Sequence, residues 1–284
     1  MAADNKVAAA YHGHQGSFGY QRIVRRRMHW MCRQTTGRKV LDIGCSQGIT
    51  SVLLAREGFD VLGVDVHPGS IAAAMEAKEQ EDPGPRKRLR FEVTDGDLAD
   101  LDELFDTIVL GEVVEHLAQP DKMVDRCVRL LIPKGRLILT TPLGVHLAPD
   151  HKEPLRPSDL RKLLASRFCL EAWEHFSWTG AANQWLGFSC VLSDDRDENW
   201  ASYADPCLRL AEAGLISAQF DNAELRHKNQ ALTKRLRALV SVQDRVASAE
   251  QELKEARMQA RTAKAKYDHV KSRRMVRLLD AFGR

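Results

Sequence analysis

Between residues 38 and 195, short apolar runs alternate with amphipathic stretches, and this alternation restricts the folds that are open to the chain. The runs Val40 to Ile43 and Val61 to Val64 are almost entirely apolar, as strands buried on both faces should be. Strands that alternate with helices in this way predict a parallel sheet with helices on both faces. We therefore expect an α/β fold with a doubly wound, mostly parallel sheet.

The same pattern assigns the remaining elements. Further strands are expected at 89–97, 108–110 and 137–139, and helices at 49–56, 70–80 and 123–131. After Pro142 a helix is predicted at 158–164, capped by Ser158. The segments 169–177 and 185–193 then read as a closing pair of antiparallel strands.

Composition excludes several classes of protein. The 284 residues are 44% hydrophobic and 29% charged, which suits one catalytic-size domain with an extra element, or two small domains. A net charge of +3 is too small to indicate nucleic-acid binding. Six scattered cysteines without a C-x-x-C pair predict reduced thiols rather than a zinc finger or a disulfide framework. With no signal peptide and no membrane-length apolar run, we expect a soluble, cytoplasmic protein.

The C-terminal part has a heptad pattern. From about residue 215 there is no proline, and apolar or small residues recur every seven positions. These positions are Leu225, Leu232, Leu239, Val246, Leu253, Ala260 and Tyr267. The second set of core positions in each heptad is mostly polar, so the contact between helices would be weak or shifted. A single solvated helix is the alternative to a coiled coil. About 55 helical residues would extend roughly 80 Å, which favours a partner strand and a homo-oligomer.

The last fourteen residues, KSRRMVRLLDAFGR, mix arginines with apolar side chains. A solvated helix end would explain the charges, but the apolar residues favour a membrane surface or a protein partner. The acidic stretch 194–205 is a poor core former and marks a domain boundary. We therefore expect an N-terminal lid and helix at 1–34, a catalytic-size domain at 35–195, a linker at 196–214 and a coiled coil at 215–284.

A glycine turn follows the first buried strand. Gly44 and Gly48 permit a tight turn into the next helix and let a ligand approach bare backbone amides. No Gly-Lys-Ser/Thr follows, so the turn is not a triphosphate-binding loop. Asp65 ends the next strand, where such a sheet presents a carboxylate to ribose hydroxyls. Asp97 stands at the end of the third strand, in reach of an adenine amino group.

Five motifs in this order resemble the class I S-adenosylmethionine-dependent methyltransferases over about residues 35–195. They are LDIGCSQG at 41–48, VLGVD at 61–65, GDL at 96–98, FDTIVLGEVVEHL at 105–117 and LIPKGRLILTTP at 131–142. The resemblance implies a Rossmann-like, seven-stranded sheet and S-adenosylmethionine as cofactor. A dinucleotide oxidoreductase is disfavoured because the turn lacks G-x-G-x-x-G.

The resemblance also implies where the cofactor lies. Its methionine part would meet the region of Asp42 and Gly44, its ribose Asp65, and its adenine the segment Gly96 to Leu98. The full candidate set is Asp42, Gly44, Cys45, Ser46, Gly48, Asp65, Val66, Gly96, Asp97, Leu98 and Gly111.

The segment EVVEH places Glu112, Glu115 and His116 on one face if it is helical. The carboxylates would then orient the imidazole, or the three would bind Mg²⁺, Mn²⁺ or zinc together with His151 or His146. The segment resembles E-x-x-E-H in ubiquinone-pathway O-methyltransferases and in small-RNA 3′-terminal 2′-O-methyltransferases, which both place a histidine beyond the fifth strand. The aromatic and basic flanking pattern of the RNA family is missing here.

Methyl transfer to oxygen needs a base or a metal ion, because a hydroxyl is a poor nucleophile. Histidine suits this role at neutral pH, so His116 is the main candidate, with Glu112 beside it. His14 is a rival base, since the segment YHGHQGSFGYQR at 11–22 stands where the family keeps a lid. A polar terminus without a role is the alternative for that segment.

These features predict an O-methyltransferase that acts on a hydroxyl of a sugar, a glycan or another hydroxylated metabolite. The basic tail is also similar in composition to the ends of many bacterial cell-surface glycan enzymes, which suggests polysaccharide biosynthesis at the inner membrane surface. RNA 2′-O-methylation is an alternative within enzymes. A coiled-coil scaffold with a non-catalytic methyltransferase domain is the alternative outside them.

Overall fold

The computed structural model describes residues 6–96, 98–143, 157–177, 184–193, 200, 251, 253–258 and 264. Contacts within the chain divide it into two compact units, Met1–Asp221 and Asn222–Arg284. The sheet and the candidate site belong to the first unit.

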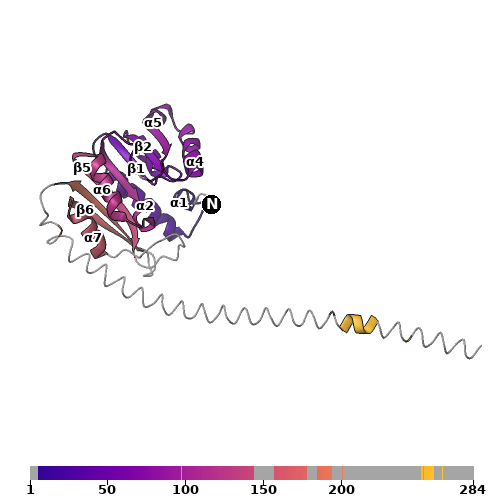
Figure 1. Ribbon diagram of the computed structural model, residues 1–284. Helices are drawn as coiled ribbons and strands as arrows, with labels where there is room; N and C mark the ends of the chain where they lie inside the picture. Colours follow the sequence, from indigo (N-terminus) through magenta and orange to yellow (C-terminus); the bar gives the residue numbers. More distant parts are fainter. Residues whose placement is uncertain are drawn as a thin grey trace, which may run out of the picture. The chain divides into compact units, whose positions relative to one another are not determined.

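A seven-stranded sheet forms the centre of the first unit (Figure 1). Its strands are β1 (Lys39–Ile43), β2 (Asp60–Asp65), β3 (Leu89–Val93), β4 (Phe105–Gly111), β5 (Leu131–Leu143), β6 (Phe168–Ser177) and β7 (Gln184–Leu192). Their order is β3-β2-β1-β4-β5-β7-β6, and β7 runs antiparallel to both of its neighbours. The predicted doubly wound, mostly parallel seven-stranded sheet is confirmed, as is the antiparallel closing pair.

The helices are α1 (Lys6–Tyr11), α2 (Phe18–Gln34), α3 (Ile49–Arg56), α4 (Pro68–Glu79), α5 (Pro83–Arg88), α6 (Pro120–Leu130) and α7 (Pro157–Ala165), with a short 3₁₀ helix η1 (Val114–His116). Proline is the first residue of four of them, because its missing N–H costs nothing there and its φ is preset. Ser158 therefore lies inside α7 and does not cap it, which corrects the prediction.

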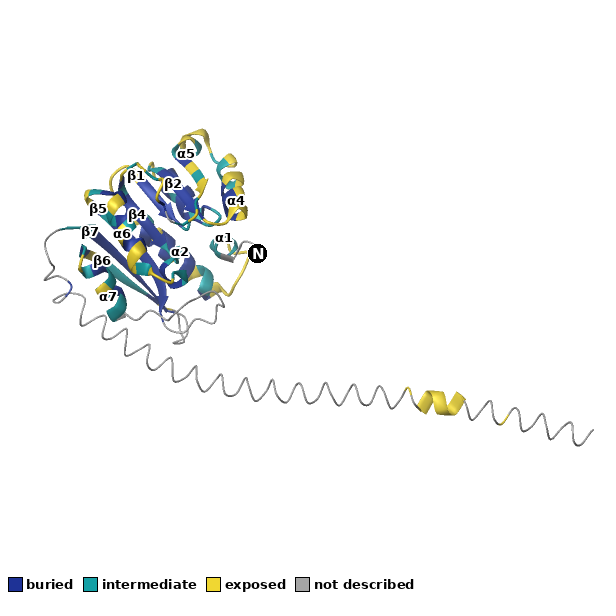
Figure 2. Cartoon of the chain, in the orientation of Figure 1, coloured by how far each residue is buried: buried dark blue, intermediate teal, exposed yellow. Residues whose placement is uncertain are grey.

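Alternate residues of each strand point to opposite faces of the sheet and build two hydrophobic layers. On one face Val40 and Val109 pack with residues of α2 and α3. On the other face Leu41 and Ile108 pack with residues of α6 and α7. Figure 2 shows the central strands buried between these layers. The sheet is thus a rigid platform whose strand ends present side chains and loops.

The core of the first unit reaches into the segment that the sequence assigned to a linker. The Trp200 side chain is fully buried, its Nε1 donates to the Phe168 carbonyl oxygen at 3.0 Å, and its ring lies 5.7 Å from that of Phe188. The acidic residues around Trp200 concealed this contact, because one aromatic in a charged segment gives no periodic signal.

In the second unit, residues 251, 253–258 and 264 are helical and exposed. The other heptad positions lie outside the described residues, so the coiled coil stays a prediction. The described cysteines Cys32, Cys45, Cys127, Cys169 and Cys190 are free thiols, and Cys207 lies outside the described part. None of the helices in the described ranges has the length and apolar character needed to cross a membrane.

Candidate cofactor and acceptor site

The candidate site lies at the carboxyl ends of the strands, beside the point where the strand order reverses. β1 pairs with β2 on one side and with β4 on the other, so the connections that follow β1 and β4 leave in opposite directions. Open α/β sheets bind ligands at such a switch point.

The glycine turn after β1 is held by backbone hydrogen bonds. The N–H groups of Gly44 and Cys45 donate to the Val64 carbonyl oxygen at 2.8 and 3.0 Å. Gly44 and Gly48 have φ values of +71° and +77°, in the left-handed region. A Cβ on Gly44 would lie 2.6 Å from Cγ2 of Val113, so the turn needs glycine for space as well as for conformation.

Asp65 joins this turn to the one after β2. Its carboxylate accepts hydrogen bonds from the backbone N–H groups of Ser46 at 2.9 Å and His67 at 2.8 Å. The Asp65 carboxylate is therefore fixed between the two turns, at the strand end where the sequence placed it.

Asp42, which the resemblance places near the methionine part of the cofactor, is buried. It lies under the turn, and its Oδ2 accepts a hydrogen bond from Ser51 Oγ of α3 at 2.6 Å. Burial, and to a smaller extent the nearby charge of Asp65, raise its pKa to about 7. The neighbouring Cys45 thiol is also buried, and burial raises its pKa.

The free energy of unfolding should depend on the protonation of Asp42. The pKa of Asp42 in the folded state lies above the unfolded value of about 3.9, so the protonated side chain favours the folded state. Its contribution to the free energy of unfolding is therefore fully present below pH 4 and is lost as pH rises to about 7. Asp42→Asn keeps an oxygen for Ser51 but cannot ionise. Between pH 5 and 8, wild type should lose about 2–3 kcal/mol more than this variant in urea unfolding of the apo protein. Asp60→Asn, at a half-buried carboxylate on the amino edge, is the control, and parallel curves for wild type and Asp42→Asn would contradict the assignment.

The predicted adenine side is an apolar edge. Val66 follows β2 and Val93 ends the adjacent strand β3, and these residues are 50% and 51% exposed. Gly96 has φ +84°, and its carbonyl oxygen accepts from Arg126 at 3.2 Å. Leu98 is buried, whereas Asp97 lies outside the described residues. An exposed apolar edge of this kind suits a flat ring.

Backbone strain concentrates in the same region. Among the described residues, the non-glycine residues with positive φ are Ser46, Leu98, Glu112 and Lys134. Three of these four belong to the predicted site residues. Such conformations persist where the surrounding structure enforces them, which happens often at binding sites.

The predicted common helical face of EVVEH is wrong. Gly111 ends β4, and Glu112 has φ +61° with its N–H donating to the Thr140 carbonyl oxygen at 2.9 Å. Only Val114 to His116 form the 3₁₀ helix η1. Pairing with β5 thus holds Glu112 outside the helix, so Glu112 does not share a helical face with Glu115 and His116.

Glu112 instead meets two residues that sequence reasoning missed. Its Oε2 accepts from Trp185 Nε1 of β7 at 2.8 Å and lies 3.4 Å from an NH1 atom of Arg27 in α2. The Arg27 guanidinium stacks over the Trp185 ring, 5.4 Å from a ring centroid. A signal for Arg27 existed, because it lies at helical spacing within the apolar stripe that includes Ile23 and Met31.

Glu115 lies beside this group. Its side chain is buried, and its Oε2 accepts from Thr141 Oγ1 at 3.1 Å. Burial, followed by the negative charge of Glu112, raises the pKa of Glu115 well above its usual value.

The described members of the predicted metal set do not form a metal centre by themselves. Within the described ranges, no group of three His, Cys, Asp or Glu side chains is arranged to hold a metal ion. The Arg27 cation beside Glu112 also competes with a metal ion for that carboxylate. His146 and His151 lie outside the described residues, so a complete set of Glu112, Glu115, His116 and His151 remains a prediction.

His14 lies in an exposed turn after α1. Its ring centroid is 6.2 Å from that of His12, and Gln21 Nε2 donates to the neighbouring carbonyl oxygens of Gly13 and Gln15. Tyr11 hydrogen-bonds His29 of α2 through its hydroxyl at 2.9 Å. These contacts pack the turn against α2, and none of them links His14 to Glu112.

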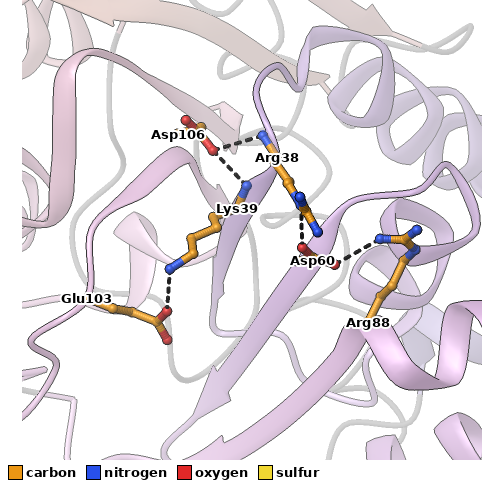
Figure 3. Close-up of polar contacts among 6 residues, drawn as sticks. All are labelled: Arg38, Lys39, Asp60, Arg88, Glu103 and Asp106. Carbon is orange, nitrogen blue, oxygen red and sulfur yellow. Dashed lines mark hydrogen bonds and ion pairs between the residues drawn. The ribbon is translucent and has the colours of Figure 1, made fainter.

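The opposite, amino edge of the sheet carries a network of ion pairs (Figure 3). Asp60 pairs with Arg38 and Arg88, while Asp106 accepts from the backbone N–H groups of Arg38 and Lys39. A recess opens here, but its wall consists of strand starts and these paired charges. Exposed pairs contribute little stability each, so this edge mainly ties the strand starts together.

The chain is similar to known methyltransferases in sequence. A family model described as a methyltransferase domain matches residues 41–139. A ubiquinone biosynthesis O-methyltransferase of Azorhizobium caulinodans is 38% identical over 109 residues, which are 38% of this chain and 42% of that protein. The chain thus covers less than half of the length of this relative.

Solved structures share the fold. Magnesium protoporphyrin IX methyltransferase from Synechocystis PCC 6803, with bound S-adenosylhomocysteine, matches with a TM-score of 0.53 at 23% identity, over 66% of this chain and 92% of that chain. The cyclase SpnF matches with a TM-score of 0.53 at 18% identity, over 63% of this chain and 84% of that one. A protein named as a cyclase thus has this fold too, so the fold alone does not define the reaction. Residues 41–139 of this chain are thus similar in sequence to a methyltransferase domain, and the sheet around them shares its fold with a solved methyltransferase.

Proposed function

We propose that this protein transfers the methyl group of S-adenosylmethionine to a hydroxyl oxygen of a sugar, a glycan or another hydroxylated metabolite. The observation that carries the proposal is the position of two features at one edge of the sheet. The glycine turn tied to Asp65 follows β1 and β2, and the polar group of Glu112 follows the adjacent strand β4. A cofactor in the first would face an acceptor in the second.

The relative from Azorhizobium caulinodans is named as an O-methyltransferase, and this name supports oxygen as the accepting atom. It favours a phenolic or quinol-type hydroxyl among the hydroxylated metabolites. Sugar and glycan acceptors gain no support from that name, and they stay in the proposal on the sequence pattern alone.

The proposed reaction is a single displacement. The acceptor oxygen forms a bond to the methyl carbon while the bond from this carbon to sulfur breaks, and S-adenosylhomocysteine leaves. His116, or His14 as the rival base, takes the hydroxyl proton. Asp65 would hold the ribose, and the glycine turn, where no side chain stands on Gly44 or Gly48, would let the methionine part approach the backbone closely.

A methyl-transfer assay with purified protein tests this function. S-adenosylmethionine labelled in its methyl group is offered with sugars, quinols or short RNA, and we expect labelled product from a small hydroxylated acceptor. His116→Ala should lower kcat by about 10²–10⁴ and leave S-adenosylhomocysteine binding unchanged. His14→Ala is the matched variant of the rival base, and a reversed result would assign the proton transfer to His14.

The same assay in excess chelator tests the metal. Glu112, Glu115, His116 and His151 could hold an ion that lowers the pKa of the acceptor hydroxyl. In that case the chelator should abolish turnover and leave cofactor binding intact, and added Mn²⁺ or Mg²⁺ should restore turnover. Full activity in chelator would mean that His116 acts without a metal ion. Salt-dependent methylation of RNA would support the RNA alternative, and cofactor binding without any turnover would support a scaffold.

The C-terminal part is proposed to assemble the enzyme. Its heptad residues would join copies of the chain, and its basic end would contact a protein or the inner face of a membrane from the cytoplasm. Both proposals rest on the sequence pattern.

A further inference from the structure

Four polar atoms at the carboxyl edge of the sheet make no hydrogen bond within the described structure. They are Nε and NH1 of Arg27, Oε1 of Glu112 and Oε1 of Glu115. The side chain of Arg27 is 97% buried, since only 3% of it is exposed. Buried polar groups are normally hydrogen-bonded, and leaving them without a partner is costly, so this cluster is suited to a polar ligand.

The cluster is held in place from three sides. Arg27 comes from α2, Glu112 from the end of β4 and Trp185 from the start of β7. The indole N–H of Trp185 and the stacked guanidinium both face the same carboxylate oxygen of Glu112, at 2.8 and 3.4 Å. This leaves Oε1 of Glu112 and Nε of Arg27 without a partner, while NH1 of Arg27 makes only the 3.4 Å ion-pair contact.

We infer that Arg27 and Glu112 form a subsite that binds a neutral hydroxyl group and rejects a carboxylate at the same place. A hydroxyl oxygen accepts from an N–H of Arg27 while its proton is donated to Oε1 of Glu112. A carboxylate could accept from Arg27, but it has no proton to offer and would meet the negative charge of Glu112. The inference rests on the proposed function, because it describes the acceptor side of that site.

The subsite is tested with two matched pairs of probes on protein loaded with S-adenosylhomocysteine. The pairs are benzyl alcohol with benzoate and methyl glucoside with methyl glucuronoside, followed by ligand-observed NMR in the millimolar range. We expect at least one neutral probe to bind and its carboxylate partner to bind about ten-fold more weakly or not at all. Stronger binding of the carboxylates, or no binding of either neutral probe, would overturn the inference.

Variants of Arg27 locate the binding. Arg27→Met should weaken the neutral probe about ten-fold or more, whereas Arg26→Met, at the next residue, should not, because Arg26 is paired with Glu174 and stacks on Phe176. Arg27→Lys keeps the charge without the planar fork of donors, so it should fold and still lose several-fold in affinity. Unchanged probe binding in a folded Arg27 variant would refute the subsite.

The two proposals fail in different ways. If the probes bind in an Arg27-dependent way but no methyl transfer is found, the subsite is supported and the proposed activity is refuted. If the protein transfers methyl to an acceptor whose KM is the same in wild type and Arg27→Lys, the proposed activity is supported and the subsite is refuted. Calorimetry with S-adenosylhomocysteine on the same samples checks that the cofactor side is intact.

Discussion

Asp65→Ala should weaken the binding of S-adenosylhomocysteine by about ten-fold to a hundred-fold in calorimetry. A hydrogen bond to a charged group contributes about 1.5–3 kcal/mol, and the variant removes the carboxylate proposed to hold the ribose. It also removes the acceptor for the N–H groups of Ser46 and His67, so both turns that border the cofactor lose their link. The loss should therefore be at least that of a ribose contact alone.

The same strand provides the control. Asp60 begins β2 as Asp65 ends it, and its ion pairs with Arg38 and Arg88 lie at the amino edge. Asp60→Ala should leave affinity for S-adenosylhomocysteine unchanged and cost little stability, because its pairs are exposed. Equal affinities of wild type and Asp65→Ala would remove Asp65 from the cofactor site.

Gly44→Ala should lower both stability and cofactor affinity. The left-handed φ of +71° costs a residue with a side chain about 1–2 kcal/mol, and the added Cβ would press on Val113 at 2.6 Å. Relief of that clash must move the turn that would border the cofactor. We expect a loss of about 2–4 kcal/mol in chemical unfolding and at least about ten-fold weaker binding of S-adenosylhomocysteine.

Gly58→Ala separates backbone strain from the clash. Gly58 has φ +101°, but a Cβ there would meet nothing within 4 Å. This variant should lose stability and keep its affinity for the cofactor. If Gly44→Ala bound the cofactor as tightly as Gly58→Ala does, the glycine turn would have no part in binding.

The fold could be predicted from the sequence because its signals are local. Buried strands need apolar runs, the turn after β1 needs glycine, and each run is short enough to recognise by itself. The antiparallel pair β6 and β7 was found in the same way. Local pattern also located Asp65, since a carboxylate at a strand end is visible in the chain.

Two of the predictions that failed depended on contacts between distant segments. The helical face of EVVEH failed because Glu112 pairs with Thr140 of β5, a contact across 28 positions that no helical periodicity reports. Trp200 was assigned to a linker for a similar reason, since its partners Phe168 and Phe188 come from the two closing strands.

The sequence by itself determined the sheet, the glycine turn and the methyltransferase motifs, because each follows from spacing along a few neighbouring residues. Only the tertiary structure decided what surrounds Glu112. Arg27 comes from α2 and Trp185 from β7, which lie near the two ends of the first unit's described sequence. Folding brings the Arg27 guanidinium and the Trp185 indole N–H to one carboxylate, that of Glu112. Such a cluster depends on which helix covers the sheet and which strand enters beside β5, and no spacing in the sequence encodes that choice.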